Sequence, residues 1–356
     1  MMFIKKLNLK NYRNIINLEI CFDEKINLIY GKNAQGKTNL IESLYFSSHL
    51  KSFRTSKLND IINVDSNYTS INLKVNNQYT DNDIKYILSK NNIKEITVND
   101  KKPDKNKFFK IINSILYYPD EVSYLKIYPN YRRNFIDRSI FNLNNEYIDI
   151  VRKYNRCLKQ RNIILKNNDK NLNVWTDQLI EFGSTIINYR NIFVNEMNLL
   201  LNNQTKENKI NENYSIDYTK YELNKIKEDL FFRYKKNNDK EYKYGYTLVG
   251  PHTDDFIFKI NDKDIRKYSS EGQKKSFLLN YKQAQLFIYK KKFGFFPILI
   301  FDDMGSELDE NRKKNFIYRI IENTGQVFIT TTEIPKSLSN TSIFEVDNGI
   351  IAEKKN

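Results

Sequence analysis

The residues best suited to chemistry form a glycine-bounded loop near the start of the chain. The loop consists of Gly31, Lys32, Asn33, Ala34, Gln35, Gly36, Lys37 and Thr38. It matches the pattern G-x-x-x-x-G-K-[ST], in which the glycines let backbone N–H groups face phosphate oxygens. Lys37 would reach the β- and γ-phosphates of ATP, and the Thr38 hydroxyl would ligate Mg²⁺. The loop follows a strand-like segment and precedes a helical pattern, as phosphate binding requires, although an ordinary strand–turn–helix is the alternative.

Two adjacent carboxylates could form the other half of a nucleotide site. Asp302 and Asp303 follow the apolar run 297–301, which is typical of a buried strand. Asp302 would complete the Mg²⁺ shell, and Asp303 would orient or deprotonate the attacking water. Alternatively, both could simply cap the next turn. They follow Thr38 by more than two thirds of the chain. This separation indicates a large insertion, as in the SMC branch of ABC ATPases.

A third candidate element precedes a helical pattern that has Phe277 and Tyr281 on one face. Ser270 and Gln273 fit a capping box, S-x-x-Q, which has a purely structural role. Together with Gly272 they also fit an ABC signature. In that interpretation the serine hydroxyl, the Gly272 amide and the helix N-terminus bind the γ-phosphate held by another subunit. One capped helix end can serve both roles.

Two further segments fit an ABC ATPase less specifically. Residues 304–309 are similar to a D-loop, although they could also be a loop and a helix N-cap. Thr330 and its two threonine neighbours end the strand-like run 327–329, where most ABC proteins have a switch histidine. A threonine there could hold the attacking water or sense the γ-phosphate.

These motifs need a scaffold, and the hydrophobic pattern predicts an α/β fold with an inserted helical arm. Ile16, Leu18, Ile20 and Phe22 alternate with polar residues, which predicts a half-buried strand. Residues 61–100 contain more short strand patterns. The fold class that we predict is an ABC/SMC-type P-loop ATPase head with an inserted, mainly helical arm (lid) domain.

The helical repeats set the predicted boundaries. Spacings of 3 and 4 between apolar residues predict two long helices, joined by a polar turn at 166–173. Residues 204–246 are polar and carry only weak strand signals. We therefore predict a head of residues 1–118 and 247–356, with the arm at 119–246.

Composition restricts the possible partners and the compartment. The 58 basic and 43 acidic residues give a formal net charge of +15, which favours nucleic acid or an acidic membrane surface. Cys21 and Cys157 are the only cysteines, which is typical of a reducing compartment. With only His49 and His252, a histidine-rich metal site is disfavoured. No apolar run is long enough to span a membrane, so we expect a cytoplasmic protein.

Two groups of basic residues are candidates for binding DNA through its phosphates. The first group avoids the apolar stripe of a predicted helix and comprises Arg152, Lys153, Arg156 and Lys159. The second comprises Lys51, Arg54 and Lys57. Each group could instead be a solvated face without a partner. Arg132, Arg133 and Arg138 could be internal salt-bridge partners of Asp137 and its neighbours.

With these residues in view, the chain resembles the RecF family over nearly its whole length. Besides the motifs above, the resemblance rests on residues 9–14, 52–54, 118–120, 129–137, 158–162, 250–255 and 326–330. The Arg-Arg-x-Phe-Ile-Asp and Gly-Pro-His-x-Asp-Asp pieces are the most specific. Glu271 occupies a signature position where many ABC proteins have glycine, and no Q-loop glutamine is evident near Pro119.

The resemblance implies a specific function. It implies binding of ATP and Mg²⁺, ATP-dependent homodimerisation, slow and DNA-stimulated hydrolysis used as a switch, and binding of single- and double-stranded DNA at gap junctions. It also implies cooperation with RecO and RecR in loading RecA, in support of the SOS response. The alternatives are an SMC-like ATPase with another chromosomal role, a metabolic P-loop phosphotransferase, and an ABC transporter subunit.

Overall fold

The chain forms two compact units in its computed structural model. Unit 1 comprises residues 1–121 and 285–356, and unit 2 comprises residues 122–284. The structure describes residues 1–77, 80–91, 94–103, 111–169, 171–207, 212–218, 221–303, 325–334 and 341–354. The phosphate loop belongs to unit 1, whereas the candidate signature belongs to unit 2.

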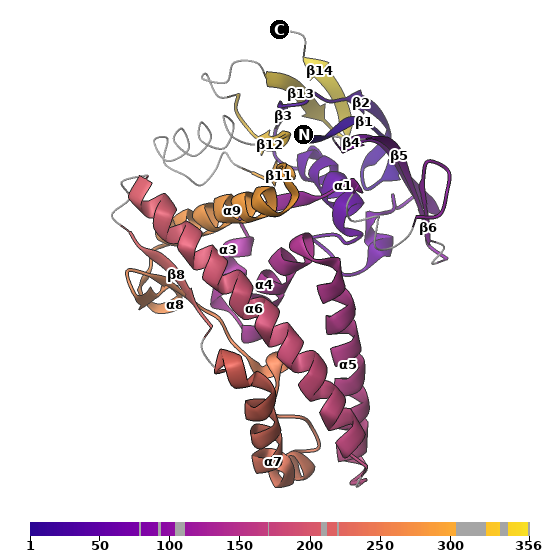
Figure 1. Cartoon of the computed structure of the whole chain (residues 1–356). Helices are drawn as coiled ribbons and strands as arrows, with labels where there is room; N and C mark the ends of the chain where they lie inside the picture. Colours follow the sequence, from indigo (N-terminus) through magenta and orange to yellow (C-terminus); the bar gives the residue numbers. More distant parts are fainter. Residues whose placement is uncertain are drawn as a thin grey trace. The chain divides into compact units, whose positions relative to one another are not determined.

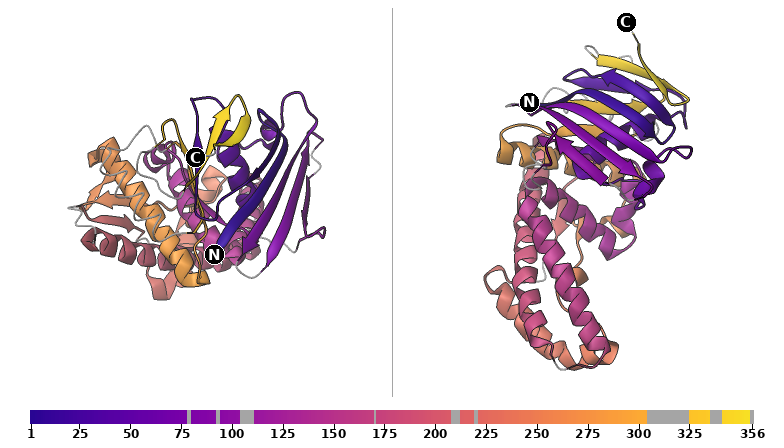
Figure 2. Two further views of the ribbon diagram at one scale, coloured as in Figure 1. Left: turned by 90° about the horizontal axis from the view of Figure 1, so that it is seen from above. Right: turned by 90° about the vertical axis from the view of Figure 1, so that its right-hand side faces the viewer.

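Unit 1 contains an antiparallel sheet of five strands (Figure 2). Its strands are Met2–Tyr12 (β1), Ile15–Cys21 (β2), Tyr68–Asn77 (β4), Asp81–Ser89 (β5) and Lys94–Val98 (β6). Their order is β2-β1-β4-β5-β6. Outward-facing polar residues alternate with buried residues along β4 and β5, as expected of a sheet covered on one face.

The second sheet of unit 1 carries the phosphate loop. Its strands are Ile26–Tyr30 (β3), Ser114–Tyr117 (β7), Ile298–Phe301 (β11), Val327–Thr331 (β12), Thr341–Asp347 (β13) and Ile350–Lys354 (β14). Their order is β14-β13-β3-β12-β11-β7, with every neighbouring pair parallel except β13–β14. All residues of β7, β11 and β12 are buried, which is typical of parallel strands covered on both faces.

Side chains of unit 1 join its two sheets. The ring of Phe22 packs edge-on against Phe328 at 4.8 Å and Phe344 at 5.5 Å between ring centroids. The buried amide of Gln326 accepts a hydrogen bond from the Ile4 N–H and donates to the Ile4 carbonyl, both at 2.8 Å. Helix Lys37–His49 (α1) packs against β7 and β12, and a short 3-10 helix occupies Leu58–Ile61. The parallel sheet therefore has fixed neighbours where the phosphate loop begins.

Unit 2 is mainly helical. Its helices are Pro129–Leu143 (α4), Asn145–Lys166 (α5), Asn173–Glu207 (α6), Ile226–Tyr244 (α7) and Ile265–Tyr268 (α8). Figure 1 shows α5, α6 and α7 side by side. A small antiparallel sheet has the order β10-β9-β8 and comprises Tyr214–Asp217 (β8), Ile257–Ile260 (β9) and Lys263–Asp264 (β10). Single 3-10 turns occupy Leu223–Lys225 and Pro251–Thr253.

Two helices cross the boundary between the units. They are Glu121–Lys126 (α3) and Glu271–Phe293 (α9). Phe277, Tyr281, Ala284 and Ile288 are all buried on one face of α9, as the sequence predicts.

Buried ion pairs hold the segments of unit 2 together. Arg190 pairs with Asp137 at 2.9 Å, and Arg161 pairs with Glu241 at 2.7 Å. Arg132 is buried as an internal ion-pair partner, but it bonds Asp255 rather than Asp137. A buried charge without its partner is costly, so these pairs fix which segments meet.

The predicted head–arm division at residue 247 does not coincide with the boundary between the compact units. Residues 247–284 cluster with the helices of unit 2. The reason is that β9 pairs with β8, and Phe258 packs against Phe135 at 5.8 Å and Phe277 at 5.5 Å. The other predicted boundary, at 118, lies three residues from the observed one at 121.

The weak strand signals between 204 and 246 are correct for β8 but wrong for α7. Ile226, Leu230, Tyr234 and Glu241 form the buried face of this helix. Because a tyrosine and a glutamate occupy part of that face, the apolar period that reveals most helices is incomplete. Among the described residues, no helix is both long and apolar enough to cross a membrane.

Candidate nucleotide-binding site

The phosphate loop lies between β3 and α1, as the sequence predicts. Gly31 faces the backbone of β13, where a Cβ atom would stand 2.3 Å from the Val346 carbonyl oxygen. Gly36 has φ +117°, in the left-handed region, and a Cβ there would lie 3.0 Å from the Asn14 side-chain amide. Both positions therefore require glycine, the first for close approach and the second for backbone conformation.

Lys37 points back into the curl of its own loop. Its Nζ donates hydrogen bonds to the carbonyl oxygens of Gly31 at 2.7 Å and Lys32 at 2.8 Å. Burial lowers the pKa of Lys37, while the carboxylates of Asp303 and Asp302 act in the opposite direction. The ammonium group is thus surrounded by the loop and two acids, where it can meet a phosphate.

The two halves of the predicted site meet at the carboxyl ends of the parallel strands β3 and β11, which β12 separates. Thr38 and Asp302 are 264 residues apart in sequence, yet the Thr38 hydroxyl donates to Asp302 Oδ1 at 3.1 Å. The hydroxyl of Thr330, on the strand between β3 and β11, donates to the same oxygen at 2.8 Å. Ligands in open α/β sheets bind at this edge.

Asp302 and Asp303 have different environments. Asp302 is 7% exposed, and this burial raises its pKa, while the hydrogen bonds from Thr330 and Thr38 lower it. Asp303 has φ +49°, which is uncommon for a non-glycine residue, and its N–H donates to Thr330 Oγ1 at 2.7 Å. Thr330 is therefore hydrogen-bonded to both Asp302 and Asp303. Its place at the end of a strand-like run does not predict these two contacts.

The turn between β13 and β14 fixes the phosphate loop from outside. The Asn348 N–H donates to Gln35 Oε1 at 2.6 Å, and the Gly349 N–H donates to the Gln35 carbonyl at 2.8 Å. The Asn14 amide also donates to that carbonyl, at 3.3 Å. Sequence reasoning assigned Gln35 to the loop but missed these supports, because they come from both ends of the chain.

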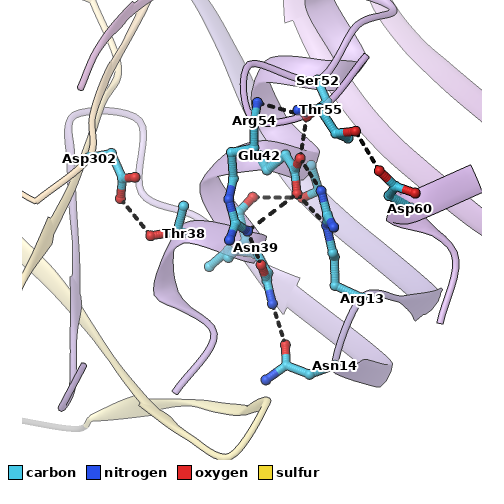
Figure 3. Close-up of polar contacts among 12 residues, drawn as sticks. Arg13, Asn14, Thr38, Asn39, Glu42, Ser52, Arg54, Thr55, Asp60 and Asp302 are labelled. Carbon is cyan, nitrogen blue, oxygen red and sulfur yellow. Dashed lines mark hydrogen bonds and ion pairs between the residues drawn. The ribbon is translucent and has the colours of Figure 1, made fainter. Parts of the chain in front are cut away.

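A buried carboxylate connects α1 to the loop at 51–57 (Figure 3). Glu42 is fully buried and accepts two hydrogen bonds from Arg13, at 2.8 and 2.7 Å, and one from the Ser52 hydroxyl. Arg54 lies 3.8 Å from Glu42 and donates to Asn39 Oδ1 at 2.6 Å. The role of Glu42 is not predictable from the sequence, because an acid inside a helical pattern is usually solvated.

The same contacts bear on the second basic group. All three residues of this group are exposed, and the guanidinium of Arg54 also contacts Glu42 and Asn39 within unit 1. The loop that carries all three is therefore tied directly to the helix that begins at Lys37.

The candidate signature forms the predicted capping box. The Gln273 N–H donates to Ser270 Oγ at 3.2 Å, and the Ser270 N–H donates to Gln273 Oε1 at 2.9 Å. Gln273 also donates to Glu212 at 2.9 Å. Ser270 and Gly272 are exposed at the start of α9. Since the serine oxygen accepts the capping bond, its O–H remains able to donate to a phosphate.

The first basic group forms an exposed face of α5. All four residues are exposed, namely Arg152, Lys153, Arg156 and Lys159. Tyr154 and Cys157 are buried on the opposite side of the helix. Arg152 makes an exposed ion pair with Asp149, at 3.3 Å. The next arginine, Arg161, is buried and paired with Glu241, so it does not belong to this face.

The predicted D-loop-like segment, 304–309, lies outside the described residues. Thr331, which the sequence grouped with Thr330, uses its hydroxyl to donate to the Glu333 carbonyl at 2.8 Å. In the described part of the chain, no three His, Cys, Asp or Glu side chains gather to hold a metal ion.

The chain is similar to one protein family over nearly its whole length. Residues 3–351 match the family described as RecF/RecN/SMC N terminal domain. The chain is 37% identical to a DNA replication and repair protein RecF of Clostridium acetobutylicum, covering 99% of this chain and 100% of the relative. It is 35% identical to the protein of the same name from Syntrophotalea carbinolica, covering 94% and 93%.

Solved structures give the same result. The recombination mediator protein RecF-ATPrS in the RecFOR pathway superposes with a TM-score of 0.90 at 32% identity, covering 99% of this chain and 98% of that one. An Smc head domain from Pyrococcus furiosus matches with a TM-score of 0.58 at 16% identity, which shows the ABC/SMC-type ATPase fold alone. The family match over residues 3–351 and the similarity to full-length relatives show that the chain belongs to the RecF family.

Proposed function

We propose that this chain is an ATP-switched, DNA-binding protein of DNA replication and recombinational repair. The observation that carries the proposal is the contact between Thr38 and Asp302. It joins a phosphate loop to an acidic strand end across 264 residues of sequence. That layout is expected of an SMC-like head, and the RecF relatives named above carry the corresponding function in their names.

The oxygen donors of the site suit Mg²⁺ bound with ATP. Thr38 and Asp302 present a hydroxyl and a carboxylate, the hard ligands that this ion prefers. Bound Mg²⁺ would neutralise charge on the β- and γ-phosphates. Lys37 would bind those phosphates, and the N–H groups of residues 31–36 would surround them. Asp303 would orient or deprotonate the attacking water. As the resemblance to the RecF family implies, hydrolysis would be slow and would serve as a switch.

The signature residues support a site shared between two copies of the chain. Ser270 and Gly272 are exposed at the beginning of a long, capped helix, the end of the helix that attracts anions. They would contact the γ-phosphate of ATP held by a second copy. ATP binding would then drive homodimerisation through a twofold interface.

The basic face of α5 supports DNA binding. Four exposed cations on one helix face suit the backbone phosphates of DNA, and contacts to phosphate carry no sequence information. Both single- and double-stranded DNA, including gap junctions, would fit this mode. By analogy with the RecFOR pathway of the solved relative, RecO and RecR are the proposed partners in loading RecA, in support of the SOS response.

Light scattering with nucleotides tests the switch directly. We expect the chain to be monomeric alone and with ADP, and to form a dimer with ATP that DNA stabilises further. The physical reason is that only ATP has the γ-phosphate that the opposite signature would contact. A chain that stays monomeric with ATP and DNA, and instead phosphorylates a small acceptor, would be a metabolic phosphotransferase.

Charge reversal on α5 is expected to weaken DNA binding for every sequence. Replacing Arg152, Arg156 and Lys159 with glutamate removes three phosphate contacts. Hence the slope of log K against log salt should become shallower by about 3. Fluorescence anisotropy at several salt concentrations measures this slope.

The matched control carries the same charge change on another exposed helix face. Its substituted residues are Lys235, Lys236 and Lys240 on α7. An α5 variant with the slope of the parent would refute this DNA surface, and the loop at 51–57 would be tested next.

A further inference from the structure

The first turn of α9 contains a carboxylate where the proposed function needs a phosphate. Glu271 lies between Ser270 and Gly272, and its side chain is 60% exposed. An acid at this position favours the helix dipole. It would also repel a phosphate that approaches the same helix end, because like charges in a partly desolvated site interact strongly. Glu271 therefore stabilises the helix but opposes phosphate binding at the signature.

Two lysines act on this carboxylate. Lys126, the last residue of α3, donates to Glu271 Oε1, and Lys274 donates to the same oxygen at 3.2 Å. The hydrogen bond from Lys126 lowers the pKa of Glu271, so the acid is ionised and held. Two cations and one anion give this cluster a net positive charge, which suits an incoming phosphate.

The two lysines are not equivalent. Lys274 belongs to α9 itself and its side chain is only 8% exposed. Lys126 comes from a different helix, and its side chain is 32% exposed. It therefore ties the Glu271 carboxylate to a second helix, α3, in addition to its own helix. Without Lys126, Lys274 alone of these two lysines would hold the carboxylate, at the start of α9.

We propose that Lys126 is a positioning residue of the signature, acting through Glu271. By holding this carboxylate and cancelling its charge, Lys126 lets the start of α9 accept the triphosphate of ATP carried by a second copy of the chain. The inference rests on the proposed function and adds to it an element outside the signature motif.

The effect should appear in dimerisation and not in folding. The Lys126–Glu271 pair is exposed in the single chain, and pairs of this kind contribute little to stability. In a closed interface water is excluded, so an uncompensated carboxylate beside phosphate becomes costly. A residue with a merely structural role would show the opposite pattern.

Three variants of the full chain, with one control variant, test the inference by ATP-dependent light scattering. We expect Lys126→Ala to weaken dimerisation about tenfold, equivalent to about 1.4 kcal/mol. Lys126→Arg should behave as the parent, because it keeps the charge. Adding Glu271→Gln to Lys126→Ala should restore dimerisation to within about twofold of the parent, because it removes the repulsion. The melting temperatures of all variants should agree.

The matched control is Lys225→Ala, which removes one charge from an exposed pair with Glu222 in the same unit. If the parent dimerises and Lys126→Ala matches this control, the inference is wrong while the proposed function stands. If Glu271→Gln does not rescue Lys126→Ala, Lys126 does not act through Glu271, and the inference is again wrong. A parent that fails to dimerise with ATP overturns the proposed function, and this inference with it.

Discussion

Replacing Lys37 with alanine is expected to weaken ATP binding by about 2–3 kcal/mol, or about 30- to 140-fold. The Lys37 ammonium is buried in the loop, between the carbonyl oxygens of Gly31 and Lys32. Its charge-assisted bonds to phosphate would be lost, and no neighbouring cation in the loop is placed to replace them. Titration calorimetry with MgATP measures the change.

The control for this experiment is Lys32→Ala. It removes a lysine of the same loop whose side chain is exposed, so a small change in affinity is expected. An affinity for ATP equal to the parent's in Lys37→Ala, with the fold intact by circular dichroism, would contradict the phosphate-loop assignment.

Local patterns predicted the central sheet and its loops well. The strand before the phosphate loop, the loop itself, the helix after it, the buried strand before Asp302 and the capping box at Ser270 all occur as predicted. Each is specified by neighbouring residues: a glycine at a left-handed position, an apolar run, or a serine paired with a glutamine three residues later. Patterns between residues close in sequence can be recognised in a single sequence.

The sequence is least informative where distant residues decide the outcome. The alternating pattern predicts that Ile16 is buried, but Ile16 is 60% exposed. Ile15 is buried instead, and two exposed residues separate it from the next buried residue, Leu18. Residues 247–284 join unit 2 through the β8–β9 pairing. Strand pairing is a non-local choice that the hydrophobic pattern of one strand does not specify.

Buried charged residues are the least predictable feature of the structure. Glu42 and Arg161 look solvated in sequence because their types are seldom buried. Each is buried together with opposite charges from other segments, Glu42 with Arg13 and Arg161 with Glu241. A sequence shows the two charges but not that they meet. The contacts of Arg54 with Glu42 and Asn39 are likewise not evident from the sequence.

Mixing two inactive variants is expected to restore dimerisation if the nucleotide site is shared between chains. Lys37→Ala cannot hold ATP but keeps an intact signature. Ser270→Arg holds ATP but places a large side chain at the exposed start of α9, where it blocks the site of its partner. Each homodimer then lacks a complete site. In the mixed dimer, ATP on the Ser270→Arg chain meets the intact signature of the other chain, so one site of two is complete.

The measurement is ATP-dependent dimer formation by light scattering, with each variant alone and with an equal mixture. Dimer formation is a safer readout than turnover, since hydrolysis could require both sites to close. Ser270→Ala controls for the lost helix cap, because it removes the same capping oxygen without adding bulk. A signature acting within its own chain leaves no complete site in any pairing. If the mixture stays as inactive as its components, while both variants fold and Ser270→Arg binds ATP, the shared site is refuted.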